Sequence, residues 1–322
     1  MNTYFLGIDI GGTKCAVVAG NTDMEILAKR KFPTNHRLKA EGIIAQLLEE
    51  AKSVVKSLAD HQLTAIGISC GGPLDSKTGV IMSPPNLPSW DNIPITAIFS
   101  EALGVPAFLQ NDANACALAE WQFGAGKGTQ NMIFLTFGTG LGAGLILNGQ
   151  LYSGTNDLAG EVGHLRLADD GPLGFGKRGS FEGFCSGGGI AQLAKTMAEQ
   201  AIKTGKVPSF CENLNQLEEI TTAQVAKAAY AGDPLAKEIF ECSAYQLGRG
   251  LSFLIDILNP EVIVIGSVYA RAESLFVEQC QQVIAEEAIP MAKAVCKIVP
   301  AKLGDAIGDL ASLSIAITAM KK

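Results

Sequence analysis

The chain has 322 residues, of which 48% are hydrophobic and 18% are charged, and its formal net charge is −7. This length suits one large domain or two domains of moderate size, and the composition is that of a globular protein. Because the net charge is negative and no run of Lys and Arg is long enough to follow a phosphate backbone, nucleic acid is not an expected partner.

The cysteines and the N-terminus exclude further classes of protein. The eight cysteines are widely spaced and form no Cys-x-x-Cys pair, which argues against a zinc ribbon or a disulfide scaffold and favours a cytoplasmic protein. No basic segment precedes an apolar core at the N-terminus, so we expect no signal peptide. The longest apolar helices, expected at 247–258 and 306–319, are shorter than the ~20 residues that span a bilayer, so no membrane association is expected.

Taken in chain order, apolar runs predict strands that alternate with helices. The predicted strands are 4–10, 14–19, 64–69, 106–109, 132–137, 142–147, 261–266 and 295–300. The predicted helices are 38–59, 112–122, 187–203, 222–230, 234–258, 272–287 and 306–320. Continuous apolar strands are typical of a sheet that is covered on both faces. The order of the elements predicts an α/β chain of two related halves that divide near Gln110 and Asn111, with the last helix crossing back onto the first half.

The first Gly-rich turn runs from Asp9 to Lys14, between two predicted strands, with the sequence Asp-Ile-Gly-Gly-Thr-Lys. It is neither a Walker loop nor a dinucleotide fingerprint, because both of those patterns open a helix. Gly allows the positive φ that such a turn requires, and converging N–H groups form an anion-binding concavity. Asp9 could hold Mg²⁺ through water. An ordinary hairpin turn is the alternative interpretation.

A second turn of the same plan, Gly138-Thr139-Gly140, joins two predicted strands in the middle of the chain. Two such turns on opposite sides of a cleft can hold one polyphosphate, because each offers several N–H groups to an anion. The pair of turns therefore predicts ATP chemistry, with residues 11–14 and 138–140 contacting the same nucleotide.

Asn111 and Asp112 stand at the head of the predicted helix 112–122. Asn and Asp are favoured N-caps, so Asp112 could simply cap the helix, and spacing alone favours that interpretation. Alternatively, a carboxylate at a strand end in a cleft can accept the proton of a substrate hydroxyl. The amide of Asn111 would suit a polyol substrate.

Glu161, His164 and Glu182 form a second polar group after the second turn. His164 lies in a Gly-punctuated loop, whereas His36 and His61 lie in polar contexts that are typical of surface residues. Too few ligands of suitable spacing accompany His164 for a metal site. The two glutamates could accept hydrogen bonds from vicinal hydroxyls, with His164 between them; a solvated loop is the alternative.

Together these segments resemble the ROK family, a group of sugar kinases and sugar-responsive repressors, along nearly the whole chain. The motifs that carry the resemblance are Asp9–Lys14, Gly71-Gly72-Pro73, Pro85-Asn86-Leu87 with Trp90, Asn111-Asp112-Ala113-Asn114, Gly138-Thr139-Gly140 and Gly160-Glu161-Val162-Gly163-His164. The resemblance implies an actin-like ATPase fold with ribonuclease H-like duplicated halves, in which two domains flank a cleft. We expect a smaller domain, 1–110 joined by helix 305–322, and a larger domain, 111–304.

The resemblance implies ATP-dependent phosphorylation of a hexose, with Asp112 as the general base. Glucose, phosphorylated at O6, is the first expectation, because the set of polar groups suits a fully hydroxylated ring; N-acetylmannosamine, N-acetylglucosamine, allose and fructose are alternatives. The other residues implied to bind the sugar are Gly72, Asn86, Asn111, Glu161, His164 and Glu182. The residues implied to bind the nucleotide are Asp9, Gly11, Gly12, Thr13, Lys14, Gly138, Thr139, Gly140 and, near the adenosine, Gly266. Mg²⁺ would bridge the phosphates.

The chain departs from the family pattern in two places. Many relatives carry Cys-x-Cys-Gly-x-x-Gly-Cys-x-Glu after the histidine and bind structural zinc there, but this chain has Leu173, Phe175 and Ser180 at the cysteine positions. We therefore expect no structural zinc and predict that Leu173 and Phe175 hold the loop by apolar packing. The second departure is Ser267, where the family often has a glycine.

The family also contains repressors, which carry a helix-turn-helix domain ahead of the first strand. Only eight residues precede Asp9, so we expect a kinase, and by the resemblance a homodimer. A non-catalytic sugar sensor and an actin-like ATPase that acts in assembly are the alternatives from other classes. A NAD-linked oxidoreductase is disfavoured, because no Gly-x-Gly-x-x-Gly leads from a strand into a helix.

Overall fold

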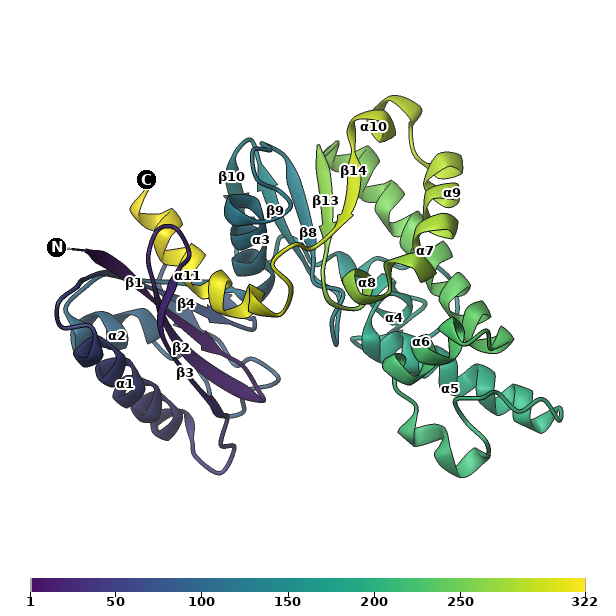
Figure 1. The fold of residues 1–322 in the computed structure, drawn as a ribbon, viewed down its shortest axis with the longest axis horizontal. Coiled ribbons are helices and arrows are strands. Elements are labelled where there is room, and N and C mark those ends of the chain that lie inside the picture. The colour runs from purple at the N-terminus through teal and green to yellow at the C-terminus, as the bar shows by residue number, and fades with distance from the viewer. Residues whose placement is uncertain (1, 322) are drawn as a thin grey trace. The chain divides into compact units, whose positions relative to one another are not determined.

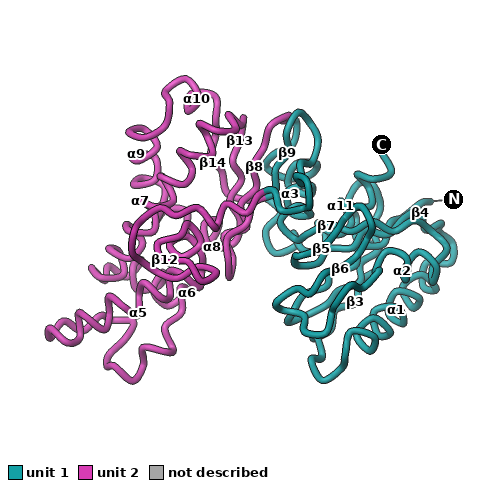
Figure 2. The backbone as a smooth tube through the Cα atoms, turned by 180° about the vertical axis from the view of Figure 1, so that it is seen from behind, with its two compact units in different colours: residues 1–128, 144–159, 302–322 teal, residues 129–143, 160–301 magenta. Residues whose placement is uncertain are grey.

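The computed structural model describes residues 2–321; Met1 and Lys322, which the expected domain bounds include, lie outside the described residues. The fold consists of two mixed five-stranded sheets with helices packed on them, so the predicted α/β class is confirmed (Figure 1). The chain forms two compact units (Figure 2). The first unit takes the chain up to Gly128, Gly144–Ala159 and the chain from Lys302 on, and the second takes Thr129–Ala143 and Gly160–Ala301. The expected domain boundary, after Gln110, differs from the boundaries of these units and stays a prediction.

The first sheet has the strand order β3-β2-β1-β4-β7. Its strands are β1 (Thr3–Ile10), β2 (Lys14–Gly20), β3 (Ile26–Pro33), β4 (Gln62–Cys70) and β7 (Ala107–Asn111). The first three strands form an antiparallel meander, and β4 and β7 run parallel to β1. Helix α1 (Ala40–Ser57) supplies apolar side chains to the core on one face, and α11 (Ile307–Met320) supplies them on the other.

Helix α11 approaches this sheet closely because two glycines lie side by side. Gly7 of β1 pairs with Gly67 of β4. A Cβ on Gly67 would lie 2.0 Å from the carbonyl oxygen of Ser312, and one on Gly7 would lie 2.3 Å from Ser312 Oγ. Any larger residue would push the helix off the sheet, so these glycines fix where the last helix packs.

The second sheet has the strand order β10-β9-β8-β13-β14. Its strands are β8 (Met132–Leu135), β9 (Ala143–Leu147), β10 (Gln150–Tyr152), β13 (Val262–Ile265) and β14 (Lys297–Pro300). Strands β8, β13 and β14 are parallel, and every residue of β8 and β13 is buried. These apolar runs are typical of strands that are covered on both faces.

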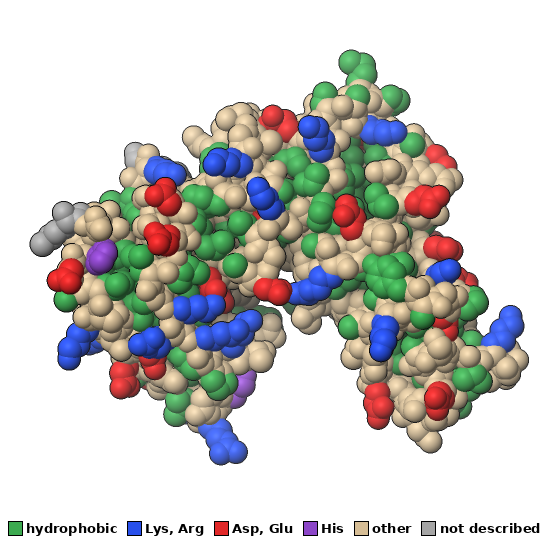
Figure 3. All heavy atoms as spheres, viewed as in Figure 1, with side chains coloured by type: hydrophobic (Ala, Val, Ile, Leu, Met, Phe, Trp, Pro, Cys, Tyr) green, Lys and Arg blue, Asp and Glu red, His purple; other side chains and the backbone are tan. Residues whose placement is uncertain are grey.

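The remaining elements are mostly helices. They are α2 (Ile95–Leu103), α3 (Asp112–Phe123), α4 (Phe181–Phe184), α5 (Gly187–Lys203), α6 (Thr222–Tyr230), α7 (Pro234–Leu258), α8 (Ser267–Ala272), α9 (Val277–Glu287) and α10 (Pro290–Val295). Two short hairpins pair β5 (Leu74–Asp75) with β6 (Val80–Ile81) and β11 (Leu173–Gly174) with β12 (Lys177–Arg178). Within the described part of the chain, no helix has the length and apolarity to cross a bilayer. Acidic and basic side chains are interspersed over the face that Figure 3 presents.

The sequence predicts α5, α6 and α7 with the correct ends, but the predicted helix 272–287 is wrong as a single helix. A 3₁₀ turn at Glu273–Leu275, preceded by Ala272 with a φ of −132°, separates α8 from α9. The buried ring of Phe276 packs against Phe137, Phe240 and Tyr269, so tertiary packing overrides the local periodicity here. The strand β3 and the helix α2 were not predicted. Most β3 side chains are exposed or half-buried, and such an edge strand has no apolar run to reveal it.

Candidate functional site

Three strand ends of the first unit lie in register. Ile10 of β1 is aligned with Cys70 of β4, which is aligned with Asn111 of β7. The Gly-rich turn, the Gly71-Gly72 segment and Asp112 therefore leave the same edge of the sheet. Ligands of open α/β sheets bind outside the carboxyl ends of parallel strands, so this edge is a candidate binding site.

The segment that follows β3 donates hydrogen bonds to the carbonyl oxygens of the first Gly-rich turn. The N–H of Gly11 donates to the carbonyl of Lys14 (3.1 Å), which closes the turn. Thr34 donates through Oγ1 to the carbonyl of Gly11 (2.6 Å) and through its N–H to that of Thr13 (2.9 Å). His36 Nε2 donates to the carbonyl of Gly12 (2.5 Å).

These contacts leave the N–H side of the turn available to a ligand. Within residues 2–321, the N–H groups of Gly12 and Thr13 have no hydrogen-bond partner. Adjacent N–H groups without protein partners form a site for an anion. Sequence reasoning missed Thr34 and His36: it interpreted His36 as a surface residue, and the ring is exposed, yet it bonds to the turn. No local signal could have revealed this contact, because it joins segments more than 20 residues apart.

The glycines of the first turn are required for close approach and not for positive φ. Neither Gly11 nor Gly12 has a positive φ, so the expected conformational reason is wrong. A Cβ on Gly11 would lie 2.8 Å from the carbonyl oxygen of Lys14, and one on Gly12 would lie 2.7 Å from that of Asn86. The second contact places Asn86 against the turn. A Cβ on Gly72 would meet no atom within 4 Å, so the backbone there borders open space.

Asn111, and not Asp112, caps helix α3. Its Oδ1 accepts a hydrogen bond from the N–H of Asn114 (2.7 Å), and Asp112 is the first helical residue. The interpretation of Asp112 as the cap is therefore wrong. With this bond made, the side chain of Asn111 still offers its NH₂ group and the second lone pair of Oδ1 to a ligand. Asp112 accepts a bond from the N–H of Ala113 (2.8 Å), but burial raises the pKa of Asp112, which makes its carboxylate a stronger base.

Asp9 lies on β1, one residue before the register line that joins the three strand ends. Burial, together with the negative charges of Asp112 and Asp309, raises the pKa of Asp9 to about 6, while Lys14 and Lys31 act in the opposite direction. Asp309 itself forms an ion pair with Lys29. The first unit therefore concentrates negative charge around Asp9, and a cation at this point would relieve the repulsion.

The second Gly-rich turn is held in the same manner by the start of α5. The N–H of Gly138 donates to the carbonyl of Gly140 (3.0 Å). The N–H groups of Gly187 and Gly188 donate to the carbonyls of Gly138 (2.7 Å) and Thr139 (3.3 Å). In the described structure, the N–H groups of Thr139 and Gly140 have no partner. Neither Gly138 nor Gly140 has a positive φ; a Cβ on Gly140 would lie 2.6 Å from a carboxylate oxygen of Glu182.

Sequence reasoning missed the role of the glycines that open α5. Ser186 is the N-cap of this helix, and its Oγ accepts from the N–H of Gly189 (2.9 Å). A Cβ on Gly189 would lie 1.9 Å from the carbonyl oxygen of Gly183, so no other residue fits there. A capping serine followed by three glycines and an apolar helix is a signal that could have drawn attention to this segment.

Glu182 and the segment that contains Glu161 and His164 gather around Leu141 in the second unit. Glu182 Oε2 accepts from the N–H of Leu141 (2.9 Å). A Cβ on Gly163 would lie 2.3 Å from the carbonyl oxygen of Leu141, so this segment packs directly on the end of the turn. The predicted phosphate turn and the predicted sugar-binding residues of the second unit are thus neighbours.

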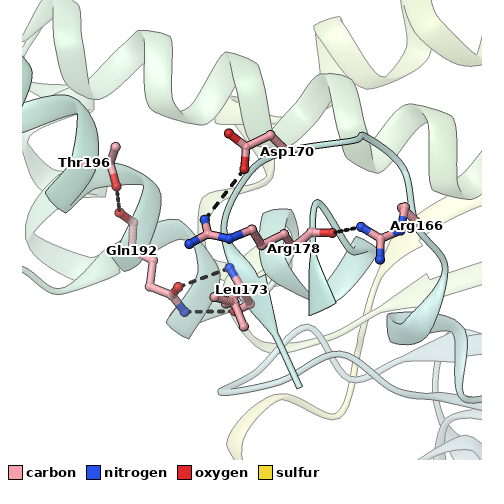
Figure 4. Close-up of polar contacts among 6 residues, drawn as sticks. All are labelled: Arg166, Asp170, Leu173, Arg178, Gln192 and Thr196. Atoms are coloured by element: carbon pink, nitrogen blue, oxygen red, sulfur yellow. Dashed lines mark hydrogen bonds and ion pairs between the residues drawn. The ribbon is translucent and has the colours of Figure 1, made fainter. Parts of the chain in front are cut away.

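The loop 165–180, at the position of the family's zinc motif, is held by polar contacts (Figure 4). The side chains of Leu173 and Phe175 are 39% and 73% exposed, so the prediction that their apolar packing holds the loop is wrong. Gln192 accepts from the N–H of Leu173 (3.2 Å) and donates to its carbonyl (3.0 Å). The Arg178 guanidinium pairs with the Asp170 carboxylate at 3.6 Å. The backbone carbonyl of Arg178 accepts a hydrogen bond from Arg166 Nη1 (2.8 Å).

His164 lies where this loop meets the candidate sugar-binding residues. The ring of Phe175 meets the His164 ring edge to face, with centroids 5.0 Å apart. Lys177 Nζ donates to the carbonyl of His164 (2.7 Å). Ser180, at the third cysteine position, is buried and caps α4 through its Oγ (3.1 Å to the N–H of Gly183). Among the described residues, no group of three or more His, Cys, Asp or Glu is arranged to hold a metal ion.

Gly266 and Ser267 follow β13 and open α8. The N–H of Gly266 donates to the carbonyl of Leu135 (2.9 Å). Ser267 has a φ of +50°, in the left-handed region that glycine adopts without strain. A Cβ on Gly138 would lie 3.7 Å from Ser267 Oγ, so this strained residue stands beside the second turn. This conformation fits the glycine that the family resemblance implies at this position.

The two sheets and their Gly-rich turns define an actin-like ATPase fold, as predicted, and the fold matches solved ROK structures. The chain belongs to the ROK family, whose model matches residues 5–319.

The relatives of this chain include kinases and repressors. The glucokinase of Halalkalibacterium halodurans is 32% identical over 294 residues, which cover 89% of this chain and 87% of that protein. The xylose repressor of Caldicellulosiruptor bescii is 27% identical over 318 residues, which cover 98% of this chain and 78% of the repressor. The crystal structure of a ROK family glucokinase from Streptomyces griseus, in complex with glucose and AMPPNP, has a TM-score of 0.75 at 28% identity and covers 98% of this chain and 99% of that one.

Proposed function

We propose that this protein is a hexose kinase that transfers the γ-phosphoryl group of ATP to O6 of glucose. The observation that carries the proposal is the shared construction of the two Gly-rich turns. In each turn, neighbouring segments engage the carbonyl oxygens, and two successive N–H groups are left for an anion. The Streptomyces griseus relative, with glucose and an ATP analogue bound, supports the same assignment.

Asp112 is the proposed general base. Its carboxylate takes the proton of the reacting hydroxyl as that oxygen attacks the γ-phosphorus. The raised pKa of Asp112 favours this role, since a stronger base accepts a proton more readily. The residues proposed to hold the other hydroxyls are Gly72, Asn86, Asn111, Glu161, His164 and Glu182.

The nucleotide is proposed to lie along both turns. Gly12 and Thr13 would bind its phosphates from the proposed smaller domain, which consists of 1–110 and the last helix. Thr139 and Gly140 would bind them from the proposed larger domain, 111–304. Lys14 and Gly11 complete the first turn, and Gly138 the second. Gly266, the N-cap of α8, would lie beside the adenosine.

Mg²⁺ would accompany the nucleotide near Asp9. The negative charge gathered around Asp9 suits a cation, and Mg²⁺ at nucleotide sites is bound by one or two carboxylates together with substrate phosphates and water. When bound, the cation would supply charge neutralisation on the phosphates. We propose the cytoplasm as the location and a homodimer as the assembly.

A coupled assay of ADP release over glucose, N-acetylglucosamine, N-acetylmannosamine, allose and fructose tests the proposal. We expect the highest kcat/KM with glucose and negligible ADP release without sugar. A higher value with another hexose would change the substrate and keep the enzyme class. Sugar-independent ATP turnover would instead support an assembly ATPase. Tight sugar binding without any turnover would support a sugar sensor, the second candidate that the xylose repressor relative suggests.

A further inference from the structure

A cavity of about 510 Å³ lies within the first unit, bounded by β7, α3, α11 and the turn between β9 and β10. Its volume is typical of sites for small organic molecules. None of the residues assigned above to sugar or nucleotide lines it. The established family activity therefore gives it no role.

The cavity is separate from the candidate catalytic site although one helix serves both. Helix α3 begins at Asp112 and lines the cavity with Leu118, Trp121 and Gln122. At 1.5 Å per residue, Gln122 lies about 15 Å from Asp112 along the helix axis. Gln110 of β7, which also lines the cavity, lies two residues before Asp112, but Asn111 and Asp112 themselves are not among its lining residues.

The walls of the cavity are mainly apolar and include two aromatic rings. Phe108 of β7 and Trp121 of α3 contribute the rings, and Leu118, Leu151 and Ile315 contribute aliphatic side chains. Planar ligands bury a large area against aromatic rings and gain from offset stacking or edge-to-face contacts. This lining favours a flat, mostly apolar ligand.

The polar part of the lining is mostly uncharged. It comprises amide and hydroxyl side chains, and Gln122 Nε2 donates to Thr318 Oγ1 (2.5 Å), which ties α3 to α11 beside the cavity. Among the described lining residues, only Lys321 is charged, and it is exposed. Because the described lining residues include one cation and no carboxylate, a single negative charge on the ligand would be complemented.

We propose that this cavity binds a planar, mostly apolar organic anion with one negative charge. The apolar body would lie against Trp121 and Phe108, and the anionic group would face Lys321 at the exposed end. The proposal does not depend on the proposed kinase function.

The test uses two dyes with a similar apolar body, 1-anilinonaphthalene-8-sulfonate, which is an anion, and the neutral N-phenyl-1-naphthylamine. We expect the anionic dye to bind the full-length protein saturably, with one dye per chain. Ala319→Phe, which fills the cavity, should weaken the binding of both dyes at least tenfold. Lys321→Gln should weaken the anionic dye about three- to fivefold and leave the neutral dye unchanged. Lys52→Gln, an exposed lysine on α1 outside the cavity, is the matched control and should change neither.

Circular dichroism and a cooperative melt establish that each variant is folded; if Ala319→Phe is not folded, the comparison of the two dyes on Lys321→Gln decides. Wild-type affinity in a folded Ala319→Phe variant would overturn the proposal, and so would an equal effect of Lys321→Gln on both dyes. Absence of saturable binding would also overturn it. Binding that emerges only on dilution would show that a second copy of the chain covers the cavity, which would replace the small-molecule proposal.

Discussion

Glu182 and Leu141 are joined by a hydrogen bond from the N–H of Leu141 to a carboxylate oxygen of Glu182 (2.9 Å). Leu141 directly follows the second Gly-rich turn, and Glu182 is the last residue of the segment that was compared with the zinc motif. One carboxylate thus belongs both to the candidate sugar-binding residues and to the support of the candidate phosphate turn. Changes at Glu182 should therefore affect both substrates.

Glu182→Ala removes the carboxylate and leaves the N–H of Leu141 without its acceptor. Hydrogen bonds to charged groups contribute about 1.5–3 kcal/mol, so we expect a 10- to 100-fold loss in kcat/KM, with a raised KM for ATP as well as for the sugar. Glu182→Gln keeps an acceptor for Leu141 and is the matched control, which should raise mainly the KM for the sugar. Steady-state kinetics with each substrate varied in turn measures this. An unchanged KM for ATP in Glu182→Ala would contradict the dual role.

Asp112→Asn removes the proposed base and keeps the shape of the side chain. We expect sugar binding, measured by calorimetry, to stay within a few-fold of wild type, while turnover falls about 10²- to 10⁴-fold. Near-normal turnover would remove Asp112 from the mechanism. Glu101→Gln, at the exposed end of α2, is the control and should leave both sugar binding and turnover unchanged. Asn114, on the same helix as Asp112, is not suitable as a control because it is buried.

The pH profile should report the same carboxylate. A base must be unprotonated to act, and burial raises the pKa of Asp112 above its ordinary value. The wild-type kcat/KM should therefore fall as the pH is lowered through that raised pKa, at a higher pH than an ordinary aspartate would give. The measurement is kcat/KM against pH at saturating ATP. A flat profile down to pH 4 would exclude a raised pKa for the catalytic group.

Asp9→Asn should stabilise the fold at neutral pH and impair catalysis. The pKa of Asp9 is raised from 3.8 to about 6, so the folded state holds an extra proton between these values and its stability falls as the pH rises through this window. The asparagine variant lacks that penalty, and its free energy of unfolding should exceed that of wild type by about 1–3 kcal/mol at neutral pH. Denaturant unfolding at neutral pH and near pH 4 measures it. The gain should disappear near pH 4, and an equal gain at both pH values would rule out the electrostatic cause.

Ser267→Gly should stabilise the protein without changing a contact of the core. Ser267 has a φ of +50°, a conformation that costs most residues about 1–2 kcal/mol and costs glycine little. We expect a gain in the free energy of unfolding of about 0.5–1.5 kcal/mol, reduced by the greater flexibility of glycine in the unfolded chain. Ser53→Gly, in the exposed middle of α1, is the control and should destabilise by about 0.5–1 kcal/mol. Effects of the same sign in both variants would contradict the conformational explanation.

The sequence by itself determined the class of fold, the extents of α5 to α7 and the family, because each of these is recorded locally. Helical periodicity, apolar runs and Gly-rich motifs need only neighbouring residues to be recognised. The edge strand β3 and the interruption at Phe276 were missed for the converse reason. The exposure of an edge strand and the packing of one buried ring depend on segments that are remote in the chain.

Only the tertiary structure decided how the candidate site is held together. Spacing alone favoured Asp112 as the cap of α3, and the structure gives the cap to Asn111. It also shows that the first turn depends on His36, and the second on Gly187, through hydrogen bonds between segments far apart in the sequence. The physical reason is that a side chain's role follows from which groups it meets after folding, whereas the sequence records only which residue types are available to meet.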